Sequence, residues 1–353
     1  MKKILRTAII GYGAAGKVFH APFITSFDGF VLSKMSTSKK ESADDAKKSY
    51  PDTEIVGTAD EIINDPAIDL VVIATPNTSH VPLARASLEA GKHVIVDKPF
   101  TITSADADEL ISTARKVNRI LSVHHNRRWD GHYKTIEKVI KSGVLGKLVD
   151  YQARYDRYRP ALRENAWREK EIPGSGILYD LGSHLIDQSL DLFGLPKEIF
   201  ADIQIQRKGA QATDRFDLIL HYPELNVHLS AGMLVREKGP SYTLHGDKGS
   251  FLKYGMDVQE DALKAGATPL NHPNWGVEPE SMWGSLETSI SGLDIKAKVE
   301  TEPGNYLDYF INVYDAITGR APLRVMPENA RNTIRIIELA AISNEQKKLV
   351  PYS

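Results

Sequence analysis

The sequence predicts an α/β protein, with a doubly wound parallel sheet in its N-terminal part and a C-terminal α+β part with a large, mostly antiparallel open sheet. In the first 124 residues, short β-branched runs alternate with segments of helical spacing, which is the order of a parallel sheet. After residue 125, longer segments alternate apolar and polar residues, as antiparallel strands with one covered face do. The length of 353 residues fits two domains of about 150 residues or more, which we place at 1–124 and 125–353.

The composition excludes several classes of function. With 44 basic and 46 acidic residues the formal net charge is −2, so we expect neither a nucleic acid nor a membrane as partner. Cysteine is absent, which excludes disulfides, thiolate metal sites and thiol nucleophiles. The first apolar run is interrupted by Arg6 and ended by Gly11, too early for a signal peptide or a membrane span. We therefore expect a cytoplasmic protein.

The first strand, in RTAIIGYGAAG, runs into the pattern Gly11-x-Gly13-x-x-Gly16, and helical spacing follows in KVFHAPFITSF. Gly11 permits a tight turn, Gly13 lets the backbone approach a pyrophosphate, and Gly16 lets helix and strand pack closely. The alternative is a glycine turn of purely structural use. The position between strand and helix favours a dinucleotide site of the Rossmann type, with phosphate at the helix N-terminus.

The end of the next strand, FVLSKMSTSKKE, indicates which dinucleotide binds. Proteins that bind NAD usually place Asp or Glu about 20 residues after the glycines, where it holds the ribose 2′-hydroxyl. This sequence has Ser36 there, followed by Thr37, Ser38, Lys39 and Lys40. Hydroxyls and positive charge suit a 2′-phosphate, so the sequence favours NADP over NAD. The alternative is that the two lysines simply begin a charged surface helix.

Two further strands end in polar residues. AIDLVVIATPNTSH ends its β-branched run at Thr75, Pro76 and Asn77, a helix follows in VPLARASLEAGK, and the strand HVIVDKPF ends at Lys98. Ligands of open parallel sheets lie at the carboxyl ends of the strands, where all four residues are expected. A lysine there could polarise a carbonyl or stabilise an alkoxide. The alternative is a surface lysine that caps the turn.

One more strand is expected in ILSVHHNRRWD, residues 120–130, at the exit from the first domain. The neighbouring His124 and His125 would point to opposite sides of such a strand. No third ligand with suitable spacing follows. We therefore expect no metal site.

The second domain begins with a helix in GHYKTIEKVIKSG and ends with two helices, in NYLDYFINVYDAITG and RNTIRIIELAAISNEQKK. Between them we expect strands in LVDYQARYDRY, EIFADIQIQR, RFDLILHYPELNVHLSAGMLV and YTLHGDKGSFLKYG, with PELN as a hairpin turn. Residues 255–302 are rich in Gly and Pro and are assigned to no element; a lid, an interface arm and a plain loop all remain open.

The stretch GSGILYDLGSHLID, residues 174–187, predicts an amphipathic helix between these strands. At about 3.6 residues per turn, Asp180, His184 and Asp187 share one stripe, opposite Leu181 and Leu185. A polar stripe usually faces water, so the spacing alone favours a solvated face over a functional cleft.

Taken together, GYGAAG, ATPNTSH, DKP and GSGILYDLGSHLID span both domains and resemble the Gfo/Idh/MocA family of nicotinamide-dependent sugar and polyol oxidoreductases. Within that family, SVHHNRRWDG, YDRYRP, WREKE and LYDLGSHLIDQ are similar to the NADP-dependent scyllo-inositol 2-dehydrogenase group. Asp97 stands where the family usually has Glu before its lysine, which is a minor departure. The resemblance favours a functional stripe, although Asp187 matches no catalytic position and is interpreted as structural.

The motifs and the resemblance together give three sets of expected site residues. The resemblance implies the catalytic set, which is Lys98, Asp180 and His184. The set implied to bind the cofactor is Gly11, Tyr12, Gly13, Ala14, Ala15, Gly16, Thr37, Ser38, Lys39, Thr75, Pro76, Asn77, His80, Lys98, Pro99, Trp167 and Arg168. The set expected to bind substrate is Lys98, Asn126, Arg127, Tyr155, Tyr158, Arg159, Asp180 and His184. Of these, Asn126, Arg127, Tyr155, Tyr158 and Arg159 could equally be ordinary surface or core residues.

The expected activity is hydride transfer between NADP(H) and a cyclic polyol or sugar, with scyllo-inositol and scyllo-inosose as the first expectation. Two alternatives remain: an NADPH-dependent reductase of a keto-sugar or anhydro-sugar, and a non-catalytic NADP-binding regulator. A small-molecule polyol or sugar is the expected partner. The open sheet also favours a homo-oligomer, a dimer or a tetramer.

Overall fold

The computed structural model describes residues 3–163 and 167–353, which divide into two compact units. The N-terminal unit comprises residues 1–126, 259–275 and 305–331. The C-terminal unit comprises residues 127–258, 276–304 and 332–353. Two late segments of the chain, 259–275 and 305–331, thus belong to the N-terminal unit. A division into 1–124 and 125–353 assigns both of them to the second domain.

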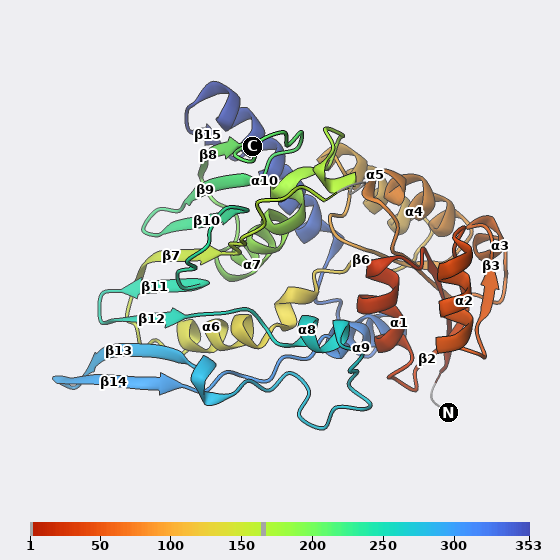
Figure 1. Cartoon of the computed structure of the whole chain (residues 1–353), viewed down its shortest axis with the longest axis horizontal. Coiled ribbons are helices and arrows are strands. Elements are labelled where there is room, and N and C mark those ends of the chain that lie inside the picture. Colours follow the sequence, from red (N-terminus) through yellow and green to blue (C-terminus); the bar gives the residue numbers. More distant parts are fainter. Residues whose placement is uncertain (1–2, 164–166) are drawn as a thin grey trace. The chain divides into compact units, whose positions relative to one another are not determined.

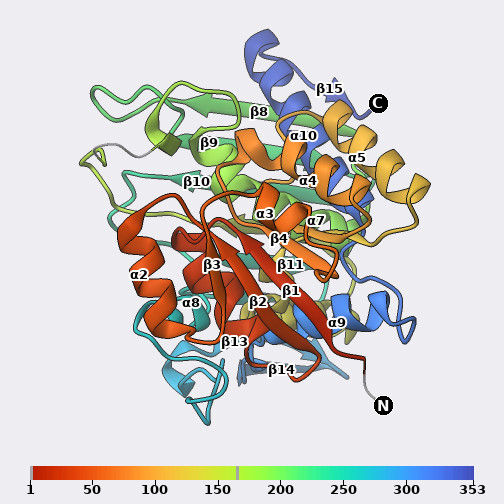
Figure 2. The ribbon, with the colours of Figure 1, turned by 90° about the vertical axis from the view of Figure 1, so that its right-hand side faces the viewer.

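The N-terminal unit is built on a six-stranded parallel sheet in the order β3-β2-β1-β4-β5-β6. Figure 2 shows β1, β2 and β3 as neighbouring arrows of the same direction. The strand order reverses between β1 and β4, which is where open parallel sheets bind their ligands. The predicted Rossmann sheet is therefore confirmed. Its strands are β1 (Leu5–Ile10), β2 (Phe30–Ser36), β3 (Glu54–Val56), β4 (Leu70–Ile73), β5 (His93–Val96) and β6 (Leu121–Val123).

The last strand, β6, ends at Val123, and a 3₁₀ turn follows at Asn126–Trp129. The strand predicted for 120–130 was therefore too long.

Helices connect these strands and complete the unit. The helices are α1 (Ala21–Ile24), α2 (Lys40–Ser49), α3 (Asp60–Ile63), α4 (His80–Glu89), α5 (Ser104–Lys116), α8 (Gln259–Lys264) and α9 (Leu307–Ile317).

The late segment with α9 is part of the core of the N-terminal unit. The rings of Phe23 and Phe310 stack with their centroids 5.7 Å apart, and both residues are fully buried. The hydroxyl of Tyr309 donates to the Oγ of Ser122, a residue of β6, at 3.0 Å. The parallel sheet therefore does not bury its apolar surface with residues 1–126 alone.

The C-terminal unit contains a nine-stranded sheet in the order β14-β13-β12-β11-β7-β10-β9-β8-β15. All its neighbours are antiparallel except β7 and β10, which confirms the mostly antiparallel sheet. The predicted hairpin at PELN joins β9 to β10. The strands are β7 (Leu148–Arg154), β8 (Glu198–Gln204), β9 (Arg215–His221), β10 (Asn226–Gly232), β11 (Tyr242–Gly246), β12 (Gly249–Lys253), β13 (Gly284–Ile290), β14 (Leu293–Val299) and β15 (Val350–Pro351).

One face of this sheet is covered by helices. Along β9, buried and half-buried side chains alternate, as expected of a strand with one covered face. Figure 1 shows the strands as a ladder with α6 (Gly131–Lys141) and α7 (Ser183–Phe193) lying along it. The long α10 (Pro327–Gln346) reaches β8, where Ser343 Oγ accepts the amide of Ala201 at 3.0 Å.

The unassigned stretch 255–302 contains regular structure. It includes α8, which belongs to the N-terminal unit, and the hairpin of β13 and β14, which extends the C-terminal sheet. Within the described residues, none of the helices combines the length and apolar character that crossing a bilayer requires.

Candidate active site

The glycine loop after β1 has the geometry of a phosphate cradle. Gly11 has a φ of 100°, and a Cβ there would lie 2.7 Å from the carbonyl oxygen of Ala74. A Cβ on Gly16 would lie 2.2 Å from the carbonyl oxygen of Gly11, so this glycine permits the close packing of helix on strand. No atom lies within 4 Å of a Cβ placed on Gly13. The loop is therefore open at the one glycine that should face a pyrophosphate, which fits a dinucleotide.

The helix after this loop is irregular where Pro22 enters it. Residues 14–24 are helical, but residues Gly16–His20 form a π-turn and α1 ends at Ile24. Proline has no amide hydrogen to donate to the preceding turn, so an ordinary α-helical hydrogen bond cannot form at residue 22. The helix predicted from KVFHAPFITSF is consequently shorter than its spacing indicated. π-Turns inside helices are frequent at functional sites.

The residues expected to distinguish NADP from NAD follow β2. Ser36 is the last residue of β2 and is buried, Thr37 is half-buried, and Ser38 and Lys39 are exposed. Lys39 directly precedes α2, whose N-terminal amides favour negative charge. Two hydroxyls and an ammonium group therefore stand near a helix N-terminus, at the end of a strand that offers no carboxylate.

His80 joins the loops that follow β4 and β5. Its Nε2 lies 3.0 Å from the carbonyl oxygen of Thr75, and its Nδ1 lies 3.0 Å from that of Pro99. The ring is only 1% exposed. Burial lowers the pKa of His80, against the attraction of Asp97 and the nearby carbonyl groups. Both ring nitrogens face backbone carbonyl groups, so His80 links the two loops to each other. Its predicted contact with the cofactor stays a prediction.

Lys98 follows β5 by two residues and is half-buried, while Asp97 before it is 9% exposed. The Asp97 Oδ1 lies 3.5 Å from His20 Nε2 and 3.6 Å from His124 Nδ1. The ligand atoms of these three buried side chains lie within 4.8 Å of one another. The expectation of no metal site rested on the opposite directions of His124 and His125 and on the lack of a third ligand with suitable spacing. The fold instead groups His124 with two residues from distant parts of the chain.

The segment with Asp180 and His184 is helical, as predicted, but begins as a π-turn at Leu178–Gly182 before α7. Its polar stripe does not face water. His184 is 5% exposed and Asp187 is 1% exposed, so neither lies on the solvated face that the spacing alone favoured. The opposite face also packs into the unit, which leaves this helix buried on two sides.

The burial of Asp187 has an evident cause. Arg128 donates from Nε to Asp187 Oδ2 at 2.8 Å and from Nη2 to Oδ1 at 2.7 Å. Its third nitrogen, Nη1, donates to Asp191 Oδ1 at 2.8 Å, and the Tyr133 hydroxyl donates to the other oxygen of Asp191 at 2.6 Å. These contacts fasten the chain at Arg128 to the helix of His184, and they agree with the structural interpretation of Asp187. The sequence offered RRW and two aspartates, but no spacing that paired them.

Asp180 lies beside the segment of Trp167 and Arg168. Arg168 Nε is 3.4 Å from Asp180 Oδ1, and its guanidinium group lies 4.5 Å from the centre of the Trp167 ring. The side chain of Arg168 is 45% exposed and that of Asp180 is 22% exposed. The structure thus brings together two residues expected to bind cofactor and one expected to be catalytic.

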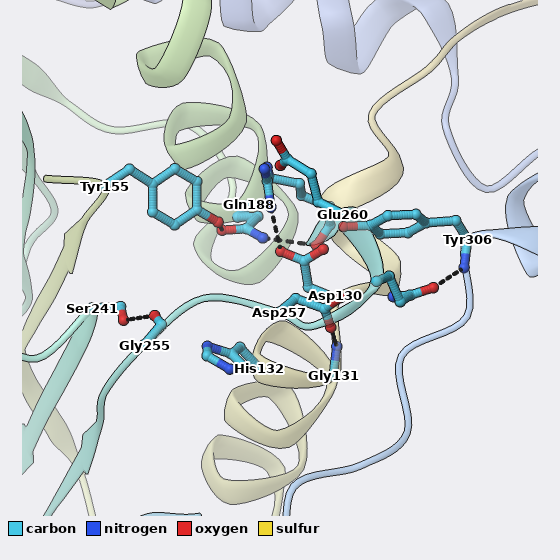
Figure 3. A network of polar contacts seen from close by, with 12 residues as sticks. Asp130, Gly131, His132, Tyr155, Gln188, Ser241, Gly255, Asp257, Glu260 and Tyr306 are labelled. Carbon is cyan, nitrogen blue, oxygen red and sulfur yellow. Dashed lines mark hydrogen bonds and ion pairs between the residues drawn. The ribbon is translucent and has the colours of Figure 1, made fainter. Parts of the chain in front are cut away.

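Two of the expected substrate residues belong to a buried polar network in the C-terminal unit. Figure 3 shows the ring of Tyr155 directed at Gln188 on α7, with 3.4 Å between the hydroxyl and Oε1. Tyr242 donates to the same Oε1 at 2.8 Å, and Gln188 Nε2 donates to the carbonyl oxygen of Arg127 at 2.8 Å. The Arg127 side chain reaches Asp130 at 3.2 Å. Burial raises the pKa of Tyr155, so its phenol acts as a hydrogen-bond donor and not as a base.

The other expected substrate residues differ in their surroundings. Tyr158 is 42% exposed and its hydroxyl accepts from Arg236 at 2.7 Å, whereas Arg159 uses its amide to bond the carbonyl oxygen of Met233 at 2.7 Å. Asn126 is 6% exposed and is the last residue of the first segment of the N-terminal unit. Sequence reasoning missed Gln188, Tyr242, Arg236 and the buried Arg207, which pairs with Asp214 at 2.8 Å. Gln188 ends the stretch LYDLGSHLIDQ, but neither it nor the other three residues has a spacing that indicates its partner, so only contacts could identify them.

The predicted catalytic residues thus come from both units. Lys98 stands at the end of β5 in the N-terminal unit, and Asp180 and His184 stand on one helix of the C-terminal unit. That the three act together stays a prediction. The N-terminal unit carries the glycine loop and Lys98, and the C-terminal unit carries the carboxylate of Asp180 and the imidazole of His184.

Comparison with known proteins places the chain in a family. Residues 5–125 match the NAD-binding Rossmann-fold model of the Gfo/Idh/MocA oxidoreductases, and residues 137–352 match the C-terminal α/β domain model of the same family. The chain is 43% identical over 349 residues to scyllo-inositol 2-dehydrogenase (NADP(+)) IolW of Bacillus subtilis (strain 168), covering 98% of this chain and 95% of that protein.

Two further relatives cover the chain almost completely. The uncharacterized oxidoreductase YdgJ of Escherichia coli (strain K12) is 42% identical over 349 residues, which are 99% of this chain and 98% of YdgJ. The crystal structure of the oxidoreductase yvaA of Bacillus subtilis superposes with a TM-score of 0.95 at 40% identity, covering 100% of this chain and 99% of yvaA. With both of its parts matched by the family models, the chain is a member of the Gfo/Idh/MocA family of oxidoreductases.

Proposed function

We propose that this oxidoreductase is an NADP-dependent dehydrogenase of a secondary alcohol on a cyclic polyol or sugar, with scyllo-inositol and scyllo-inosose as the first substrate pair. The observation that carries the proposal is the 43% identity, over nearly the whole chain, to a relative named for this reaction. The presence of Lys98, Asp180 and His184 supports it, because a protein that only binds the cofactor does not need them.

The N-terminal unit supplies the residues that would hold NADP. The loop from Gly11 to Gly16 would hold the pyrophosphate, and Thr37, Ser38 and Lys39 would hold the 2′-phosphate by hydrogen bonds and charge. When bound, NADP accepts or returns the hydride at its nicotinamide ring. The binding preference for NADP over NAD rests on the hydroxyls and the lysine after β2, where no carboxylate stands to repel a phosphate.

The protein side chains move the proton and stabilise charge. His184 accepts the proton of the substrate hydroxyl during oxidation and returns it during reduction, because imidazole titrates near neutral pH. The ammonium group of Lys98 stabilises the negative charge that develops on the same oxygen. Asp180 orients His184 or binds a neighbouring hydroxyl. Arg168, which pairs with Asp180, would control where that carboxylate points before substrate arrives.

A substrate panel tests the proposal directly. The enzyme is mixed with NADP and, in turn, with inositol isomers, hexoses and dihydrodiols, and the absorbance of the reduced cofactor is followed. We expect the fastest reduction with scyllo-inositol. Turnover only in the reverse direction, with NADPH and a keto-sugar or anhydro-sugar, would favour the reductase, and tight NADP binding without any turnover would favour the regulator. Either result would overturn the proposal.

A further inference from the structure

The N-terminal unit contains a buried polar cluster that the proposed function leaves without a role. It consists of Asp97, His20 and His124, which are 9%, 0% and 1% exposed. Each imidazole directs one nitrogen toward the same carboxylate oxygen, Asp97 Oδ1, at 3.5 Å from His20 and 3.6 Å from His124. Burying a carboxylate is costly unless polar groups compensate it, so a cluster of this kind is retained only if its members face one another.

The surroundings of the two histidines are otherwise largely apolar. Phe310 of α9 lies 6.0 Å from the His20 ring and 5.4 Å from the His124 ring, between centroids, and Tyr309 lies 4.8 Å from His124. Among the described residues, three ring nitrogens have no hydrogen-bond partner: Nδ1 and Nε2 of His20, and Nε2 of His124. Asp97 is therefore the polar group that both imidazoles face.

Electrostatics agree with this geometry. Burial by itself raises the pKa of Asp97, but the contacts with His124 and His20 outweigh it and place this pKa well below its usual range. Burial lowers the pKa of His124 to about 4, assisted by the nearby His20. Asp97 is therefore ionised at neutral pH beside a neutral His124.

The cluster connects three parts of the chain that surround the cofactor edge of the sheet. His20 ends the π-turn that follows the glycine loop, Asp97 follows β5, and His124 follows β6. Val96 and Val123 are partners in the sheet, and the amide of His124 donates to the carbonyl oxygen of Val96 at 2.9 Å, so the next residues of both strands lie side by side. Lys98 is the residue immediately after the member that touches both imidazoles.

We propose that Asp97 is a positioning residue for Lys98: its carboxylate, held between the imidazoles of His20 and His124, fixes the turn after β5 on which the lysine stands. Asp97 is buried, and Lys98, which stands in the bend after β5, is half-buried. Holding the Asp97 side chain in the core therefore fixes the backbone next to the lysine. The inference rests on the proposed function, because it assigns a use to Lys98.

A metal ion is the competing explanation, and the geometry favours it less. The rings of His20 and His124 lie against each other, with 4.3 Å between centroids and 45° between planes, and each has a nitrogen near Asp97 Oδ1. Structural zinc sites take four ligands, whereas this cluster offers one atom from each of three residues. Elemental analysis of the purified enzyme is therefore one arm of the test.

The test combines Asp97→Asn with Lys98→Met in a double-mutant cycle. Asparagine keeps the shape of Asp97 but removes the charge that both imidazoles face. We expect kcat to fall by about 10- to 100-fold in the single variant while the Kd for NADP changes little, because a small displacement of a catalytic group costs that much. In the Lys98→Met background, measured in single turnovers, Asp97→Asn should lower the rate no further, since its effect acts through the missing lysine.

The control is Glu278→Gln in the C-terminal unit. Glu278 is also a buried carboxylate beside an imidazole, that of His132, and it binds Lys253 at 2.8 Å. Its substitution should lower thermal stability but leave kcat unchanged well below the melting temperature. This variant shows how much kcat changes when a buried carboxylate is lost and the only effect is lower stability.

The outcomes separate the inference from the proposed function. If Asp97→Asn lowers the rate by the same factor with and without Lys98, or leaves kcat unchanged, its role is only structural and the inference falls. A stoichiometric metal that Asp97→Asn loses would also overturn it. If Lys98→Met itself keeps full activity with all substrates, the proposed function falls, whatever Asp97 does.

Discussion

Single residues at the ends of parallel strands decide what the N-terminal unit can bind. Gly11, Gly13 and Gly16 have three different reasons to lack a side chain: a left-handed φ, an open approach and a tight packing contact. The residues after β2 and β5 then add charge at the edge where ligands of such sheets lie. Substitutions of these single residues therefore test cofactor preference and catalysis.

The first residue-scale prediction concerns Lys98. Lys98→Met removes the charge that we propose to stabilise the developing alkoxide, so kcat should fall by about 100-fold or more, while NADP binding measured by fluorescence titration stays nearly unchanged. Lys116→Met, at an exposed position on α5, serves as the control and should behave as the wild type. Full turnover in Lys98→Met would contradict the assigned mechanism.

The second concerns cofactor preference. Combining Ser36→Asp with Lys39→Ala places a carboxylate at the end of β2 and removes a positive charge, so it should attract a ribose 2′-hydroxyl and repel a 2′-phosphate. We expect the ratio of kcat/KM for NADP over NAD to fall by about 10-fold or more, as loss of a charge-assisted contact implies. Lys47→Ala, an exposed lysine in the last turn of the same α2, is the matched control. An unchanged ratio would mean that these residues do not distinguish the 2′-phosphate of NADP from the 2′-hydroxyl of NAD.

At the scale of elements, the helix of His184 shows how buried charge fixes the segment that we propose to be catalytic. A short π-turn precedes α7, and the Arg128 guanidinium group binds both Asp187 and Asp191 on that helix. Gln188, between them, holds the backbone of Arg127. The helix is therefore tied to the start of the C-terminal unit through three polar side chains, those of Asp187, Gln188 and Asp191.

Removing the guanidinium group should be strongly destabilising. Arg128→Met leaves two carboxylates buried without their cation, which costs about 3–5 kcal/mol in the free energy of unfolding, measured with urea. Arg128→Lys keeps the charge but not the planar fork, and should fall between. The control is Arg331→Met, which breaks a pair with Asp108 that is also two-pronged, at 3.0 Å for both contacts, but is partly exposed. That substitution should cost about 1 kcal/mol or less, and equal losses in both variants would contradict the role of burial.

At the scale of the whole molecule, buried neutral histidines should make the protein sensitive to acid. Burial lowers the pKa of both His93 and His124 to about 4, with help from Arg119 and Lys3 for the first and from His20 for the second. His93 Nδ1 accepts the amide of Ile120 at 3.0 Å, which only an unprotonated nitrogen can do. In the unfolded chain both histidines titrate near pH 6.5.

The direction of the effect follows from proton linkage. Between about pH 6.5 and pH 4 the unfolded chain binds protons that the folded chain does not, so stability is complete above that window and falls as the pH falls through it. Each histidine contributes about 1 kcal/mol per pH unit, and His93, which is partly exposed, contributes less because solvent screens it. His93→Gln should flatten the pH dependence of the urea midpoint, whereas substitution of the exposed His272 should not. An equally steep profile in His93→Gln would refute this account.

The sequence by itself determined the features that depend on neighbouring residues. The alternation of strands and helices, the glycine pattern after β1 and the hairpin after β9 are all local, because backbone conformation and side-chain period depend on residues close in the chain. The same holds for the identities of Lys98, Asp180 and His184, which stand in recognisable motifs. Where a local rule was incomplete, as at Pro22, an element was shorter than its spacing indicated.

Only the tertiary structure decided which distant residues share an environment. It buried the stripe of His184 and Asp187, gave Asp187 to Arg128, and placed His20 and His124 around Asp97. It also assigned residues 259–275 and 305–331 to the N-terminal unit, where their aromatic side chains complete the core. Burial and pairing are properties of the packed interior, in which each group takes partners by proximity in space, and sequence distance carries no information about them.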